Sequence, residues 1–146
     1  MFTKLRILTA SFTLLISSTA WADLAIIAHP DSDTGEVDIQ NVRMLFLGER
    51  KSFPSGLHAT PINHVNGSPD RKEFFASVLS MPESSHTRHW NRKISTGTSH
   101  SPAELNSYEA ILQSIANTPG SISYIDASKV DDTVKVLFTV SGFDAV

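Results

Sequence analysis

Short apolar runs alternate with amphipathic stretches through most of this chain, and this alternation is the strongest constraint on its fold. Leu24 to Ala28 are predicted to form a buried strand, because this apolar run is too short for a helix and His29-Pro30 follows it. From Asp38 onward, apolar residues recur at spacings of three and four, which predicts an amphipathic helix that stops at Gly48. An α/β fold is expected from this pattern, as a single layered domain with a sheet of about four or five strands flanked by helices.

The middle of the chain continues the alternation. A second strand is expected within Ala59 to Val65. A helix is then predicted from Ser68, with Pro69 at the first helical position, where the missing N–H costs nothing. A short helix is expected around residues 84–92. The inner face of the helix after Ser68 is expected to hold Phe74, Phe75, Val78 and Leu79.

The clearest helix start signal in the sequence lies at Ser101. Serine is a favoured cap, Pro102 would occupy the first helical position, and Glu104 lies three residues after the cap. The pattern therefore predicts a helix from this point to near Asn117, where Pro119-Gly120 interrupts it. Two further strands are expected at residues 121–125 and 134–140.

The first 22 residues have the pattern of a secretory signal peptide. Lys4 and Arg6 precede an apolar run from Ile7 to Ile16, and Ala20-Trp21-Ala22 places small residues at both recognition positions. The run is much shorter than the roughly 20 residues needed to span a bilayer core, and Ser and Thr interrupt it. We expect export to the periplasm and cleavage after Ala22, which leaves residues 23–146 as one domain without membrane insertion.

Composition excludes several classes of function. The whole chain has a formal charge of −3, and removing the leader with its two positive charges makes this −5, so no basic surface is expected for nucleic acid. The absence of cysteine excludes disulfides, thiol catalysis and cysteine-ligated zinc. No nucleophile motif or paired carboxylates are evident, so we expect a protein that is not an enzyme and needs no cofactor.

Three segments together resemble a known family. They are Leu45-Phe46-Leu47-Gly48, the Trp90 region leading to Thr96-Gly97, and residues 119–125, which read Pro-Gly-Ser-Ile-Ser-Tyr-Ile. Their order and spacing resemble the second lobe of phosphate-type (type 2 periplasmic) substrate-binding proteins of ABC transporters. The family form of the last segment is Pro-Gly-Ala-Ile-Gly-Tyr-Val, so two serines here replace alanine and glycine. The resemblance runs from Leu24 onward and implies a single-lobe, periplasmic-binding-protein-like domain.

The resemblance also implies a place for an anion. Members of the family hold phosphate with an arginine at the end of a strand and a Ser-Gly-Thr sequence at the start of the next helix, where N–H groups and the helix dipole favour negative charge. Aligned without a gap, His64 takes the arginine position and Ser68 is kept, while Pro69 and Asp70 replace glycine and threonine. Three of the four positions have changed, so weak phosphate binding is expected. The candidate ligand-binding residues are His64, Asn66, Gly67, Ser68 and Arg71.

These candidates also have simpler interpretations. Asn66-Gly67 is a favoured turn pair and Ser68 a favoured helix cap, so the segment can be a turn that starts a helix and nothing more. Arg71 can equally be a solvated surface charge.

A metal site is not expected, although the chain has six histidines. His86 and His89 are three residues apart and would share one face of a helix. Glu83 is the only nearby carboxylate, and no clear third ligand follows, so these histidines are expected to be exposed on a polar helix.

Two functions follow as hypotheses. The first is non-catalytic, weak binding of a small, phosphate-like anion in connection with transport. The alternative is an accessory or sensory domain that docks on an envelope transporter or receptor and has no small-molecule ligand. A single lobe offers only half a pocket, so a homodimer or an envelope protein partner is expected to complete it.

Overall fold

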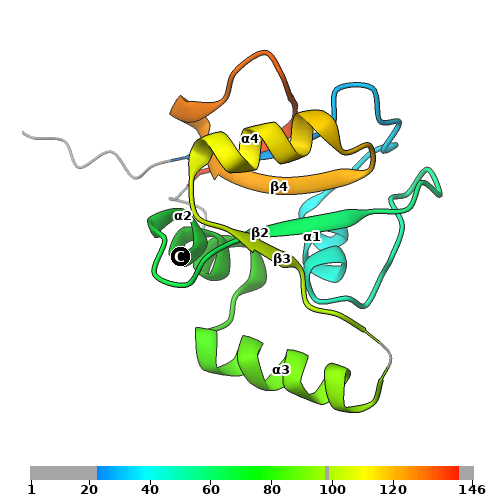
Figure 1. Cartoon of the computed structure of the whole chain (residues 1–146), viewed down its shortest axis with the longest axis vertical. Coiled ribbons are helices and arrows are strands. Elements are labelled where there is room, and N and C mark those ends of the chain that lie inside the picture. Colours follow the sequence, from blue (N-terminus) through cyan, green and yellow to red (C-terminus); the bar gives the residue numbers. More distant parts are fainter. Residues whose placement is uncertain (1–22, 98, 142–146) are drawn as a thin grey trace, which may run out of the picture.

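The computed structural model describes residues 23–97 and 99–141, which form one mixed β-sheet covered by helices (Figure 1). The predicted leader, residues 1–22, lies outside the described residues. Within the described part of the chain, no helix has the length and apolar character needed to cross a membrane. The sheet order is β3-β2-β4-β1-β5, with β1 Leu24–Ala28, β2 Thr60–His64, β3 Ala103–Leu105, β4 Ser121–Asp126 and β5 Lys135–Val140. The expected α/β class is confirmed.

Strand β1 runs against its two neighbours. It pairs antiparallel with β4 and β5, whereas β2 pairs parallel with both β3 and β4. Strands β2, β3 and β4 therefore end at the same edge of the sheet, and the loops that follow β2 and β3 lie there together. All five residues of β1 are buried, as the apolar run predicted.

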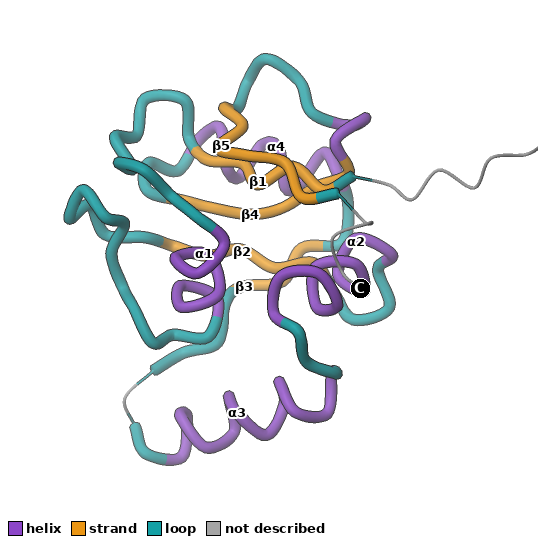
Figure 2. Tube along the Cα trace, turned by 180° about the vertical axis from the view of Figure 1, so that it is seen from behind, coloured by secondary structure: helices purple, strands orange, loops and turns teal. Residues whose placement is uncertain are grey.

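The helices cover both faces of the sheet. Leu24 and Ile26 pack in one core with α1, α2 and the helical turns after α2, whereas Ala25 and Ile27 pack in a second core beneath α4. Because successive strand residues point to opposite faces, β1 contributes to both cores. Helix α3 lies apart from the sheet, on the β3 side (Figures 1 and 2). The helices are α1 Ile39–Phe46, α2 Pro69–Phe74, α3 Glu83–Ser95 and α4 Tyr108–Asn117.

The predicted inner face of the helix after Ser68 is confirmed, although the helix changes type partway. Helix α2 continues directly into a π-helix, Phe75–Leu79. The two adjacent rings at the junction, Phe74 and Phe75, are both buried, at 0% and 4% exposed. The Phe74 ring stacks on Tyr124 of β4, with ring centroids 3.9 Å apart, and so fixes α2 against the sheet.

The helix predicted to start at Ser101 is wrong in its first turns. Ala103–Leu105 form strand β3, which pairs with Ile62, Asn63 and His64 of β2, and α4 begins after Ser107. The Ser107 hydroxyl accepts a hydrogen bond from the N–H of Ala110 at 3.1 Å. The Ser-Pro-Ala-Glu pattern is a local signal, and pairing with the neighbouring strand overrides it.

Candidate functional site

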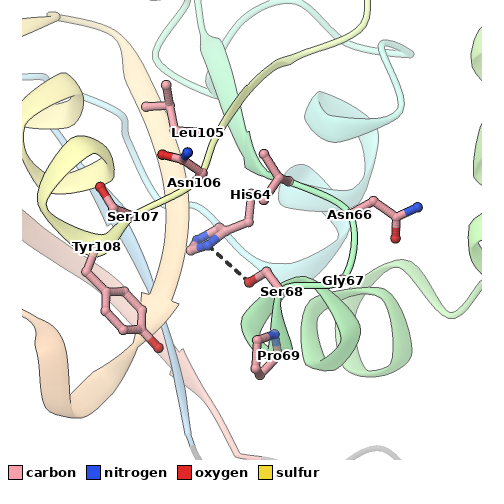
Figure 3. A pocket seen from close by; sticks show the side chains of 10 residues that line it. His64, Asn66, Gly67, Ser68, Pro69, Leu105, Asn106, Ser107 and Tyr108 are labelled. Carbon is pink, nitrogen blue, oxygen red and sulfur yellow. Dashed lines mark hydrogen bonds between the residues drawn. The ribbon is translucent and has the colours of Figure 1, made fainter.

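A cavity of about 430 Å³ opens where strands β2 and β3 end (Figure 3). One wall is the loop from His64 to the start of α2, and the other is the loop from Leu105 to the start of α4. The cavity therefore lies at the N-terminal ends of two helices, where helix dipoles favour negative charge. Its lining residues are His64, Val65, Asn66, Gly67, Ser68, Pro69, Leu105, Asn106, Ser107 and Tyr108.

The loop between β2 and α2 is a tight turn followed by a helix cap. Gly67 has a φ of +90°, a conformation that favours glycine, and the Ser68 side chain accepts a hydrogen bond from the N–H of Arg71 at 3.5 Å. Pro69 occupies the first helical position. The structure thus contains the turn and cap expected from the sequence. Because Pro69 has no N–H, this wall offers one donor fewer to an anion than a glycine would.

His64 is buried at the inner end of the cavity and carries a hydrogen on Nε2. That nitrogen lies 2.6 Å from the backbone carbonyl of Tyr124, which can only accept a hydrogen bond. The other nitrogen, Nδ1, faces the Ser68 hydroxyl at 3.5 Å (Figure 3). Burial lowers the pKa of His64 below 6.5, although the bond to Tyr124 opposes this effect. The ring is therefore neutral near pH 7 and brings no positive charge to the cavity.

Arg71 lies behind the cavity wall and is bound to two carboxylates. Its Nε and Nη2 donate to the two oxygens of Glu83 at 2.7 and 2.9 Å, and Nη1 donates to Glu104 at 2.9 Å. Nη1 also donates to the His64 carbonyl at 2.7 Å. Burial alone lowers the pKa of Arg71, but the hydrogen bonds with the two glutamates outweigh it and raise the pKa above its ordinary value. The guanidinium thus joins α2, α3, β3 and the end of β2.

Asp70 is buried, and its carboxylate does not line the cavity. One oxygen accepts from the N–H of Asp126 at 2.9 Å, and the other accepts from the Tyr108 hydroxyl at 3.3 Å. Burial and the nearby Asp70 charge raise the pKa of Tyr108. Since Tyr108 itself lines the cavity, the Asp70 charge lies just behind this wall and disfavours an anion.

Four of the five predicted site residues line the cavity. These are His64, Asn66, Gly67 and Ser68, whereas Arg71 does not reach it. The second wall, from Leu105 to Tyr108, was missed, because the helix was expected to start before it. Asn106-Ser107 was the available signal, since both residue types favour helix caps.

The histidines of α3 are more enclosed than the sequence suggested. His86 is only 6% exposed, and its ring packs on Phe75 with centroids 4.6 Å apart, so the expectation of an exposed side chain is wrong. His89 is partly buried, and its Nε2 donates to the Leu47 carbonyl at 2.6 Å. Glu83 is bound to Arg71. Within the described ranges, no group of three or more potential metal ligands is present.

No protein-family model matches the chain. Similar solved structures include an ABC-type phosphate transport receptor from Vibrio cholerae, with a TM-score of 0.63 and 13% identity over 80% of this chain and 46% of that chain. A protein from Clostridium perfringens, described as a phosphate ABC transporter substrate-binding protein with bound phosphate, has a TM-score of 0.63 and 15% identity over 80% and 44%. PstS from Borrelia burgdorferi has a TM-score of 0.59 and 14% identity over 81% and 48%.

The chain spans less than half the length of each of these proteins. At 13–15% identity the likeness concerns the fold. The described residues therefore have the α/β fold of a single lobe of the phosphate ABC-transporter substrate-binding proteins.

Proposed function

We propose that this protein is an exported, non-catalytic domain that binds a small, phosphate-like anion weakly and acts in connection with transport. The observation that carries this proposal is the cavity between His64 and Tyr108, at the N-terminal ends of α2 and α4. The solved proteins with this fold are named as phosphate receptors or substrate-binding proteins, and one of them holds phosphate.

Four features in and around the cavity support weak binding. His64 is neutral near pH 7, and Pro69 offers no N–H. Asp70 places a negative charge behind Tyr108. The cationic Arg71 is already held by Glu83 and Glu104. An anion would thus be bound mainly by uncharged donors, which give weaker hydrogen bonds than charged ones.

Isothermal titration calorimetry with inorganic phosphate at pH 7.5 tests the proposal. The unaltered chain is expected to bind with a dissociation constant in the millimolar range, about 4 kcal/mol of binding free energy. Pro69→Gly restores an N–H at the cavity wall and is expected to tighten binding about fivefold, whereas Ser68→Ala is expected to weaken it. Pro82→Gly, at the N-cap of α3, is the matched control and should leave binding unchanged.

Two results would contradict this proposal. Micromolar or tighter binding by the unaltered chain would show that the changed positions do not weaken the site. The absence of heat from both the unaltered chain and Pro69→Gly at about 10 mM phosphate would remove the anion-binding function. In that case, docking on an envelope transporter or receptor would become the better hypothesis.

A further inference from the structure

A second cavity, of about 380 Å³, lies at the opposite end of β2 and β3 from the first. Thr60 and Pro61, where β2 begins, line the second cavity, whereas His64, where β2 ends, lines the first. Ala103 and Leu105 of β3 divide between the cavities in the same way. Strands β2 and β3, which lie side by side, thus run from one cavity to the other.

The charged residues that line this second cavity are all basic. Arg50 and Lys51 follow the end of α1, and His58 and His100 add two imidazole rings. Among the described residues of its lining, none is acidic. This is a local reversal, because the whole chain has a formal charge of −3. The cavity therefore favours an anion.

The remaining lining is largely apolar and includes a tryptophan. Leu45, Ala59, Pro61 and Trp90 contribute apolar surface. Trp90 fits against the end of α1 because Gly48 has no side chain: a Cβ there would lie 2.6 Å from Cη2 of the indole. A ligand in this cavity would therefore contact apolar surface as well as positive charge.

The indole N–H of Trp90 has no hydrogen-bond partner among the described residues. The side chain is buried, with 5% of the residue exposed, and Nε1 makes no hydrogen bond to any described residue. A buried donor left unpaired destabilises the folded chain. The indole ring is part of the cavity lining, but Nε1 itself has almost no accessible surface, so a ligand there would contact the apolar part of the ring.

We propose that this second cavity binds a small organic carboxylate with an apolar side group. Arg50 and Lys51 bind the carboxylate, since a guanidinium can hold both of its oxygens. The apolar group packs on Leu45 and on the indole ring of Trp90. The volume lies within the usual range for small-molecule sites. Inorganic phosphate has no apolar group to fill this cavity, so the proposal is independent of the first site.

Tryptophan fluorescence provides the test. The chain has two tryptophans, so a full-length Trp21→Phe variant leaves Trp90 as its sole indole fluorophore. Phenylacetate, used as the probe, is expected to change the Trp90 emission saturably, and the neutral phenylacetamide to bind about tenfold more weakly. Replacing both Arg50 and Lys51 with Gln is expected to weaken phenylacetate binding about tenfold.

Matched variants separate local from general effects. Replacing the exposed Lys72 and Arg88 with Gln removes the same charge elsewhere and is expected to leave phenylacetate binding unchanged. Ser68→Ala, in the first cavity, is also expected to leave it unchanged. Trp90→Phe, measured by calorimetry, is expected to weaken binding about fivefold through loss of apolar contact with the indole ring.

Three results would overturn the proposal. The first is no saturable change in emission with phenylacetate at about 10 mM, and the second is equal binding of phenylacetate and phenylacetamide. The third is an equal loss of phenylacetate binding in the Arg50/Lys51 variant and in the Lys72/Arg88 control. Failure of phosphate binding in the first cavity would leave this inference intact. Ser68→Ala tests the first cavity, whereas the Arg50/Lys51 variant tests the second.

Discussion

At the scale of single residues, Arg71 has the largest structural role of the predicted site residues. The sequence allowed an anion ligand or a solvated surface charge, whereas the side chain is nearly buried and contacts Glu83, Glu104 and the His64 carbonyl. Its guanidinium also lies 4.7 Å from the centre of the Phe75 ring. These contacts come from segments far apart in sequence, so periodicity could not reveal them.

Arg71→Leu is expected to lower the free energy of unfolding by about 2–4 kcal/mol, because it leaves the His64 carbonyl and two carboxylates without their donor. The side chains of Glu83 and Glu104 are 35% and 47% exposed, so water partly replaces the guanidinium and keeps the loss moderate. Urea denaturation measures the change. The control Lys72→Leu, at an exposed neighbour, should stay within about 0.5 kcal/mol of the parent. Equal effects of the two variants would contradict the role assigned to Arg71.

Because two histidines are buried, we expect the folded protein to lose stability in mild acid. Burial lowers the pKa of His64 and of His86, and Arg71 and His89 further disfavour a charge on His86, whereas Glu83 and Glu104 favour it. Below about pH 6.5 the unfolded chain binds protons that the folded chain does not, so the free energy of unfolding falls as the pH falls. The hydrogen bond from Arg71 lowers the pKa of Glu83, so its contribution is lost only at lower pH, below about 4.5.

Replacing His86 with Phe tests this at residue scale. The variant is expected to show a smaller fall in the free energy of unfolding between about pH 6.5 and 5 than the parent. Urea denaturation at several pH values measures the slope. Phe75→Leu disturbs the same packing without removing a titrating group, so it should lower stability at every pH and keep the parent's slope. An unchanged slope in His86→Phe would exclude this histidine as a cause.

At the scale of elements, the start of α4 shows how tertiary pairing moves a helix boundary. The sequence placed the cap at Ser101, but Ala103–Leu105 form a strand beside β2, and the cap of α4 is Ser107, six residues later. Glu104, read as part of a capping box, instead accepts a hydrogen bond from Arg71. The same shift creates the second wall of the first cavity.

Two serine substitutions distinguish these helix starts. Ser107→Ala is expected to lower the free energy of unfolding by about 1 kcal/mol, because the N–H of Ala110 loses its acceptor. Ser101→Ala, at an exposed residue before β3, should change it by less than about 0.5 kcal/mol. Thermal or urea unfolding of both variants provides the comparison. The reverse order of effects would favour the boundary predicted from sequence.

At the scale of the whole molecule, the described residues form a single lobe, and no second lobe faces the first cavity among them. The similar solved proteins are more than twice as long as the aligned region, and this chain covers 44–48% of each. We propose that an envelope protein or a second copy of the chain covers the cavity. Either arrangement would exclude water from a site that one lobe leaves open.

Export is the prediction that belongs to this scale. Intact-mass analysis of protein recovered from the periplasm is expected to show Asp23 as the N-terminal residue, because Ala20-Trp21-Ala22 is a suitable cleavage sequence. Recovery of the protein in the membrane fraction with Met1 retained would contradict both cleavage and the proposed location.

Local sequence patterns were enough to predict the α/β class, the buried strand at Leu24–Ala28, the apolar face of α2 and the cap at Ser68, since each depends on residues close together in the chain. Three ordered motifs also indicated the lobe. The start of α4, the position of Arg71 behind the cavity and the burial of His86 follow instead from tertiary contacts. These outcomes depend on strand pairing, ion pairs and ring packing between residues 11 to 41 positions apart in the chain, which no local pattern contains.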